Sequence, residues 1–197
     1  MKIKLLADFS CNHKNEVKIM ESEIDKPMKN IGFKGMSAFF ALRDKFSDPM
    51  KKITKAKVKS GDYVLDYGCG PGSFSLSAAK VVGISGKIYA ADIHPLSAEK
   101  IHKKALKEGL TNIETITTDC STGLKDNSIN VILCFDMFHM LNDQQKVLKE
   151  FHRVLKPYAI LSLDCHHMKE IESEIVGTGL FKLVEKIDKT YNFTKVI

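Results

Sequence analysis

The sequence predicts an α/β fold in which a mostly parallel sheet is covered by helices on both faces. Segments typical of strands alternate with segments of helical periodicity, a pattern that favours parallel strands joined by crossover helices. The first predicted strand runs straight into a glycine-rich loop, and the connection between the last two is so short that they must form an antiparallel hairpin. With 197 residues, the chain is long enough to bury the core of one domain.

The N-terminal part of the chain is predicted to precede the sheet. We expect residues 1–46 to form a leader and residues 47–197 to form the sheet core, the two together making a single domain. Within the leader, a short helix is predicted near residues 16–24 and an amphipathic helix over residues 35–46. The leader lacks the glycine-rich and acidic motifs of the core, so we expect it to be a lid that supplies substrate contacts.

Helix and strand signals alternate in the sheet core. Asp48 is a good N-cap and the proline after it is a good first helical residue, so a helix is expected from there to about residue 58. Seven strands are expected after it, over residues 64–67, 86–92, 113–118, 129–135, 158–164, 181–188 and 191–197. Three further helices are expected between the strands, and they begin at Phe74, at Pro95 and at about residue 142.

The loop after the first strand is the most informative segment. Asp66 lies near the end of the strand, and Gly68, Gly70 and Gly72 follow at every second position. Glycine lets the backbone turn sharply, approach a ligand closely and present its N–H groups. A carboxylate at this point suits a cofactor that carries a positive charge better than one that carries a pyrophosphate.

Two alternatives to such a site stay open. The loop could be a strand-to-helix turn without a ligand, although three alternating glycines make that reading less favoured. It could also bind a dinucleotide, whose fingerprint is Gly-x-Gly-x-x-Gly. Counting from Gly68 and Gly70, the third glycine of that fingerprint would fall on Ser73, so the spacing does not fit.

Two more acidic residues close predicted strands in the same way. Asp92 ends the second strand, where a carboxylate in a βαβ unit accepts hydrogen bonds from ribose hydroxyls. Ile93 follows it and is expected to pack on the face of an adenine ring, and Asp119 follows the third strand. A helix N-cap role for Asp92 and a turn role for Asp119 are the alternatives, but three such acids in series favour one nucleotide site.

The pattern Asp-x-Gly-x-Gly-x-Gly of residues 66–72 closely resembles motif I of the class I S-adenosylmethionine-dependent methyltransferases. Residues 129–157 resemble the small-molecule branch of that class, typified by the ubiquinone/menaquinone-biosynthesis methyltransferases, although Tyr158 and Ala159 replace the usual glycine after Lys-Pro. The resemblance covers about residues 35–197. It implies a Rossmann-like three-layer sandwich whose seven strands have the order 3-2-1-4-5-7-6, with the last strand antiparallel.

The same resemblance implies S-adenosyl-L-methionine as the cofactor and methyl transfer to a small molecule by in-line displacement as the activity. Such a displacement needs chiefly alignment and desolvation, because a sulfonium methyl is already activated. In this class the acid after the third strand accepts a hydrogen bond from the adenine amino group, and the N–H of the next residue donates to the ring. The residues implied to bind the cofactor are Asp66, Gly68, Cys69, Gly70, Gly72, Asp92, Ile93, Asp119, Cys120 and Phe135.

A general base is needed only if the acceptor carries a proton that must leave. His139, just past the fourth strand, is the best candidate, and Asp136 could orient a substrate hydroxyl or His139 itself. His166 and His167, past the fifth strand, come next, and each histidine has a structural or solvated role as its alternative. A second function class also stays open, namely a protein that binds S-adenosylmethionine without turnover, as a sensor or partner subunit.

Positive charge is concentrated at the N-terminal end. Residues 1–60 hold 14 Lys or Arg against 7 Asp or Glu, and residues 61–197 hold 16 against 17. The excess is either a solvated face or a basic lid that attracts an anionic substrate or an anionic surface. A nucleic-acid partner is not expected, because the chain has no Trp for base stacking and no separate recognition module.

Cysteine usage favours a reduced compartment. The chain has five cysteines and no apolar N-terminal run long enough for a secretory signal, so a cytoplasmic location is expected. No apolar run reaches the ~18 residues that a membrane-spanning helix needs. Cys11 with His13, and Cys165 with the two histidines after it, offer soft ligands without the spacing of a closed four-ligand site, so no metal is expected.

Overall fold

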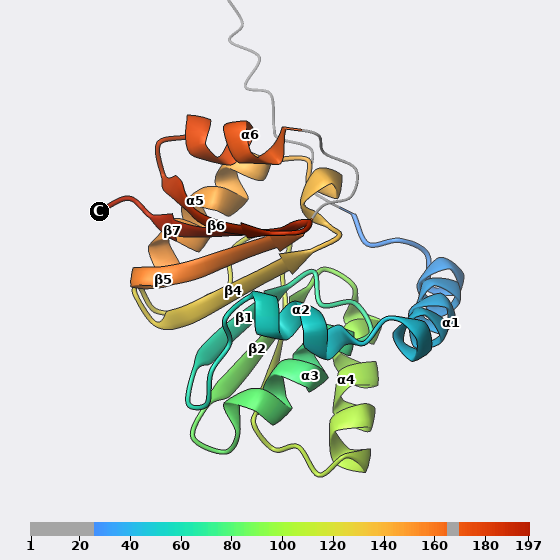
Figure 1. Ribbon diagram of the computed structural model, residues 1–197. Coiled ribbons are helices and arrows are strands. Elements are labelled where there is room, and N and C mark those ends of the chain that lie inside the picture. Colours follow the sequence, from blue (N-terminus) through green and yellow to red (C-terminus); the bar gives the residue numbers. More distant parts are fainter. Residues whose placement is uncertain (1–25, 165–169) are drawn as a thin grey trace, which may run out of the picture.

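A computed structural model describes residues 26–164 and 170–197, and these residues build a seven-stranded sheet with helices on both faces (Figure 1). The strand order is β3-β2-β1-β4-β5-β7-β6, which confirms the predicted topology. The strands are β1 (Tyr63–Tyr67), β2 (Lys87–Asp92), β3 (Ile113–Thr117), β4 (Ile129–Phe135), β5 (Leu155–Asp164), β6 (Phe181–Ile187) and β7 (Thr190–Lys195). Strands β1 to β5 pair in parallel, whereas β7 is antiparallel to both of its neighbours.

The helices lie where the sequence predicts them, with three differences. They are α1 (Asn30–Phe46), α2 (Pro49–Lys55), α3 (Ser73–Val82), α4 (Pro95–Lys107), the 3-10 turn η1 (Phe138–Met140), α5 (Gln144–Val154) and α6 (Ile171–Gly177). Helix α1 begins earlier than expected, and α2 ends earlier, at Lys55. Helix α6 was not predicted, because its seven residues include only two buried apolar side chains, Ile171 and Ile175. The predicted helix near residues 16–24 lies outside the described residues.

Two apolar layers flank the sheet. One joins the sheet to α5 and α6, with Phe151 and Phe193 fully buried in it. The other joins the sheet to α2 and α3 around Ile53 and Val82. Strand β4 contributes to both layers, which explains why its sequence is a nearly continuous apolar run.

Strand β5 begins three residues earlier than expected and contains an irregularity. Its register against β4 shifts between Ile129 and Val131, where residues 156–159 are accommodated. Tyr158 occupies this bulge with a positive φ of 64° and is largely exposed. The prediction placed Tyr158 at the strand start because the preceding proline reads as a helix terminator.

The topology creates one place for a ligand. The carboxyl ends of β1, β2, β3 and β4 meet at the same edge of the sheet, and the winding direction of the chain reverses between β1 and β4. Helix α1 lies near this edge at the side of the molecule, and α2 leads back from it to β1 (Figure 1). Among the residues that the structure describes, no helix is long and apolar enough to cross a membrane.

Candidate active site

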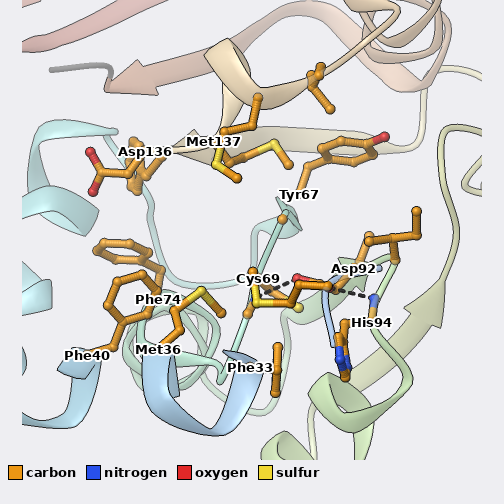
Figure 2. A pocket seen from close by; sticks show the side chains of 18 of the residues that line it. Phe33, Met36, Phe40, Tyr67, Cys69, Phe74, Asp92, His94, Asp136 and Met137 are labelled. Carbon is orange, nitrogen blue, oxygen red and sulfur yellow. Dashed lines mark hydrogen bonds between the residues drawn. The ribbon is translucent and has the colours of Figure 1, made fainter. Parts of the chain in front are cut away.

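A cavity of about 260 Å³ lies at this edge of the sheet (Figure 2). Eight of the residues predicted from the sequence to form the site line it, namely Gly68, Cys69, Gly70, Asp92, Ile93, Asp119, Phe135 and Asp136. Asp92 and His94 mark one end of the cavity and Asp136 the other, with Cys69 between them (Figure 2). Most of the remaining lining is apolar, and about half of it comes from α1 and from the segment after β4.

The glycine loop is tied to the end of β2 by its own N–H groups. The N–H groups of Gly68 and Cys69 donate to the carbonyl oxygen of Ala91, at 2.8 and 3.0 Å. The N–H of Gly70 donates to Oδ2 of Asp92 at 2.8 Å, and Oδ1 of the same carboxylate accepts from the N–H of His94 at 2.7 Å. Asp92 is therefore held in one orientation at the cavity.

Two of the glycines are required for different reasons. Gly70 has a φ of 51°, and a Cβ there would point toward Met36 and Phe40, 3.9 Å from each, in the cavity. Gly72 has a φ of 89°, and a Cβ there would come within 2.5 Å of Ile101 on α4. Gly70 thus keeps the cavity open, whereas Gly72 allows α3 and α4 to pack and does not line the cavity.

Asp66 lies beneath the loop and does not line the cavity, so the structure does not support direct contact with a ligand. Its side chain is 2% exposed and accepts a hydrogen bond from Oγ of Ser75 at 2.5 Å. Burial is the main cause that raises the pKa of Asp66 to about 7; the hydrogen bond from Ser75 opposes this rise, and the nearby charge of Asp92 adds to it. Asp66 is placed to support the loop from below.

The end of β3 brings one of its two predicted residues to the cavity. Asp119 lines the cavity, and its carbonyl oxygen accepts a hydrogen bond from the hydroxyl of Tyr67 at 3.1 Å. Cys120 does not line it; its thiol is buried, and its N–H donates to Oγ1 of Thr118 at 3.2 Å. This N–H is therefore engaged within its own loop, and its bond to an adenine ring stays a prediction.

One face of α1 closes the cavity. Phe33 is buried and stacks on the ring of His94, with centroids 4.1 Å apart and planes 15° apart. Met36, Phe40 and Arg43 follow at helical spacing and line the cavity beside Gly70 and Phe74 (Figure 2). Helix α1 is therefore a wall of the cavity along its length.

A cluster of charged side chains lies at the Asp136 end. Nζ of Lys52, on α2, lies 2.9 Å from Oδ2 of Asp136 and 3.0 Å from Oδ2 of the buried Asp164. The guanidinium of Arg43 bonds Asp44 through Nε and Nη2, at 3.1 and 2.8 Å, and its Nη1 lies 3.8 Å from Asp136. The cluster ties α1 and α2 to the ends of β4 and β5.

The same cations lie over aromatic rings. The guanidinium of Arg43 is 4.4 Å from the ring centre of Phe40 and 5.4 Å from that of Phe74. Nζ of Lys52 lies 5.3 Å from the ring centre of Phe74 and 5.4 Å from that of Phe135. Positive charge therefore meets the apolar part of the cavity at this end.

The predicted histidine is not at the cavity. His139 lies on η1 and is half-buried, but its neighbours in the chain, Met137 and Met140, line the cavity and His139 does not. The lining of the cavity therefore gives no support to the general-base role expected for His139, which stays a prediction. His166 and His167 lie outside the described residues, as do Cys11, His13 and Cys165.

Sequence reasoning missed several residues that shape the site. Phe40 lines the cavity, but Phe39, the residue before it, is 63% exposed and faces away from the cavity. The spacing of Phe33, Met36 and Phe40 is a helical stripe that could have identified the inner face of α1. Within residues 26–164 and 170–197, no group of three or more His, Cys, Asp or Glu is arranged to hold a metal ion.

Known proteins resemble this chain in both sequence and fold. A family model described as a methyltransferase domain matches residues 58–192. A demethylmenaquinone methyltransferase of Lactobacillus johnsonii is 32% identical over 109 residues, which are 54% of this chain and 45% of that protein. The aklanonic acid methyltransferase DauC of Streptomyces sp. (strain C5) is 29% identical over 118 residues, 58% of this chain and 54% of its own length.

The solved structures agree on the fold. A SAM-dependent methyltransferase from Aquifex aeolicus superposes with a TM-score of 0.74 at 23% identity, over 87% of this chain and all of that one. At that identity the likeness bears on the fold alone. This chain spans about half the length of the curated relatives that it matches.

Proposed function

This chain belongs to the class I S-adenosylmethionine-dependent methyltransferases, and we propose that it transfers the methyl group of that cofactor to a small-molecule acceptor by in-line displacement. The observation that carries the proposal is a mostly apolar cavity that has the fixed carboxylate of Asp92 at one end and the charged cluster around Asp136 at the other. Two relatives are named as methyltransferases of demethylmenaquinone and of aklanonic acid, and both names support a small-molecule acceptor.

The residues at the β2 end fit the adenosine part of the cofactor. Each oxygen of the Asp92 carboxylate accepts one backbone N–H, and each keeps a lone pair for a ribose hydroxyl. The side of Gly70 that a Cβ would fill opens into the cavity, so the loop leaves room for a ligand close to its backbone. Ile93 and Asp119 both line the cavity. We propose that Ile93 packs on the face of the adenine ring and that Asp119 accepts a hydrogen bond from the adenine amino group.

The residues at the Asp136 end fit the amino-acid tail and the acceptor. Two N–H groups on Nη1 of Arg43 are not used by Asp44, and we assign them to the carboxylate of the tail. When bound, S-adenosylmethionine supplies a methyl group that its sulfonium already activates. The chain then has to exclude water and align the acceptor, and Phe74, Phe135 and Met137 provide an apolar surface for this purpose.

Asp136 is the polar group we place beside the acceptor. It lines the cavity, has a positive φ of 56°, and is held by Lys52 at 2.9 Å. A non-glycine residue in that conformation persists where its surroundings hold it, and such residues concentrate at functional sites. We propose that Asp136 orients a hydroxyl or amine of the acceptor, and we assign no role in catalysis to His139.

The proposal is tested by looking for a methylated product. The pure protein is incubated with methyl-labelled S-adenosylmethionine and a whole-cell extract, with Asp92→Ala as the matched control. We expect label in a low-molecular-weight product with the wild type and at least tenfold less with the control. Binding of the cofactor without label in any product would instead favour a sensor or partner subunit, and label in protein or nucleic acid would contradict a small-molecule acceptor.

A further inference from the structure

The outer face of α1 carries an apolar stripe that no described part of the chain covers. It consists of four exposed side chains, namely Ile31 (82% exposed), Phe39 (63%), Leu42 (55%) and Phe46 (85%). Their spacing, with Gly35 between the first two, follows the three- and four-residue repeat of one helical face. We call these four side chains the α1 stripe.

The stripe is not the face that closes the cavity. Phe33, Met36 and Phe40 lie on the inner face, and the four side chains of the stripe do not line the cavity. Helix α1 lies at the rim of the molecule, with α3 and α4 on one side of it (Figure 1). Four large apolar side chains on one face of a peripheral helix are more than the scattered exposure that soluble surfaces normally show.

Basic residues accompany the stripe. Residues 26–46 hold five Lys or Arg and one acidic residue, Asp44. Asp44 is engaged by Arg43 and by the hydroxyl of Ser73, so its charge is already compensated. The lysines Lys26, Lys29 and Lys34 are exposed. An apolar face flanked by exposed lysines is the pattern of a helix that lies in the interface of an anionic membrane.

We propose that the α1 stripe docks this protein on the surface of an anionic lipid bilayer, with the helix lying in the membrane plane. This goes beyond the proposed methyl transfer and does not depend on it. Two methionines at the cavity, Met28 and Met140, are 41% and 61% exposed, so the cavity opens on an apolar rim. A docked protein would present such a rim to a ligand that partitions into lipid.

A second copy of the chain fits the stripe less well. An aromatic side chain buries roughly 150–250 Å², so the four residues supply on the order of 500 Å², whereas a specific dimer buries about 800 Å² per partner. A symmetric dimer through this face would also bring Lys29 and Lys34 of both copies to the same interface, where like charges repel. The charge favours an anionic surface over a copy of the same basic helix.

The test is flotation of the full chain with lipid vesicles. We expect binding to vesicles of equal parts phosphatidylglycerol and phosphatidylcholine, little binding to phosphatidylcholine alone, and loss of binding in high salt. Phe39→Ser combined with Phe46→Ser should lower the affinity at least tenfold. The matched control is Ile84→Ser with Val184→Ser, which removes two other exposed apolar side chains and should leave binding unchanged.

A second pair of variants tests the charge. Lys29→Gln with Lys34→Gln should weaken binding roughly fivefold per lysine, since each contributes about 1 kcal/mol near an anionic surface. Lys149→Gln with Lys182→Gln, exposed lysines on α5 and β6, should have little effect. The unfolding midpoint of every variant checks the fold, so loss of binding is separable from loss of structure and from any failure of methyl transfer.

Three results would overturn the proposal. The first is equal binding to both kinds of vesicle or to neither. The second is that the protein is a dimer at micromolar concentration and that Phe39→Ser with Phe46→Ser converts it to a monomer. The stripe would then be an interface with a second copy of the chain. The third is that a chain lacking residues 1–25 binds vesicles whereas the full chain does not, which would mean that the chain itself covers the stripe.

Discussion

Asp66 is a buried carboxylic acid under the loop, and its environment predicts how the stability of the protein depends on pH. Its pKa is raised from 3.8 to about 7, so between these values the folded state binds a proton that the unfolded state has lost. The folded state is therefore favoured at the acidic end, and its stability falls as pH rises from about 4 to about 7 and is level above that.

The substitution Asp66→Asn removes this titration and isolates its effect. Between pH 5 and pH 8 we expect the free energy of unfolding of the wild type to fall by roughly 2.5 kcal/mol relative to that of the variant. Urea unfolding at the two pH values measures the difference. A wild type and variant with parallel pH profiles would show that Asp66 is ionised in the folded protein.

Arg43 is predicted to recognise the tail of the cofactor rather than its nucleoside. S-adenosylhomocysteine has the amino-acid carboxylate and 5′-methylthioadenosine lacks it, so the two ligands separate the ends of the cavity. Arg43→Met should lower the affinity for S-adenosylhomocysteine roughly tenfold, as expected for the loss of a charge-assisted hydrogen bond. It should change the affinity for methylthioadenosine by no more than about twofold. Lys26→Met, which alters a second cation of the lining, is the control. An equal loss of affinity for both ligands would indicate that Arg43 acts by holding α1 in place.

The backbone conformation of Tyr158 is predicted to lower the free energy of unfolding. A tyrosine at a φ of 64° is strained by roughly 1–2 kcal/mol, and its exposed ring offers little packing in return. Tyr158→Gly should therefore raise the free energy of unfolding by about 1 kcal/mol in denaturant titration. Asn127 has a φ of 51°, and Asn127→Gly should raise the free energy of unfolding by less, because asparagine tolerates this conformation. A destabilised Tyr158→Gly protein would show that the ring contributes packing that outweighs the strain.

Among the elements, α1 is the one whose state should depend on the ligand. It is held by the stack of Phe33 on His94 and by contacts of Arg43 and Asp44, and none of its side chains belongs to the two apolar layers of the described sheet. The cavity of about 260 Å³ is at the lower limit for ligand sites, so α1 is expected to move outward to admit a cofactor and an acceptor together. This retains the prediction that the leader acts as a lid.

Hydrogen exchange measures this directly. Without ligand, amides of α1 should exchange faster than those of β4, and S-adenosylhomocysteine should slow the exchange of α1 while β4 stays unchanged. If α1 is as protected as β4 before ligand is added, it is a permanent structural layer.

At the scale of the whole molecule, the sheet could be predicted because its signals are local. Strand β4 has the predicted bounds, residues 129–135, since an apolar run flanked by polar residues defines both of its ends. The end of β2 is likewise marked by Asp92. The start of β5 was missed because Pro157, which lies within the strand, is also typical of a position just after a helix. Helix α6 was missed because its apolar pattern is too short.

The site was less predictable because half of it is assembled by packing. Lys52 and Asp164 are 112 positions apart (164 − 52) and meet only once α2 lies over the end of β5. The stack of Phe33 on His94 joins the leader to the start of α4, and neither residue alone signals it. Motif residues such as Gly70 and Asp92 were found because their chemistry depends on neighbours close in the chain.

The central claim is that the cavity binds S-adenosylmethionine with its ribose on Asp92. Calorimetric titration of the wild type and of Asp92→Ala with S-adenosylhomocysteine, and of the wild type with NAD, tests it most directly. We predict that the wild type binds S-adenosylhomocysteine and not NAD, and that Asp92→Ala binds at least tenfold more weakly with its circular dichroism unchanged. Tighter binding of NAD than of S-adenosylhomocysteine, or full affinity in a folded Asp92→Ala protein, would contradict the claim.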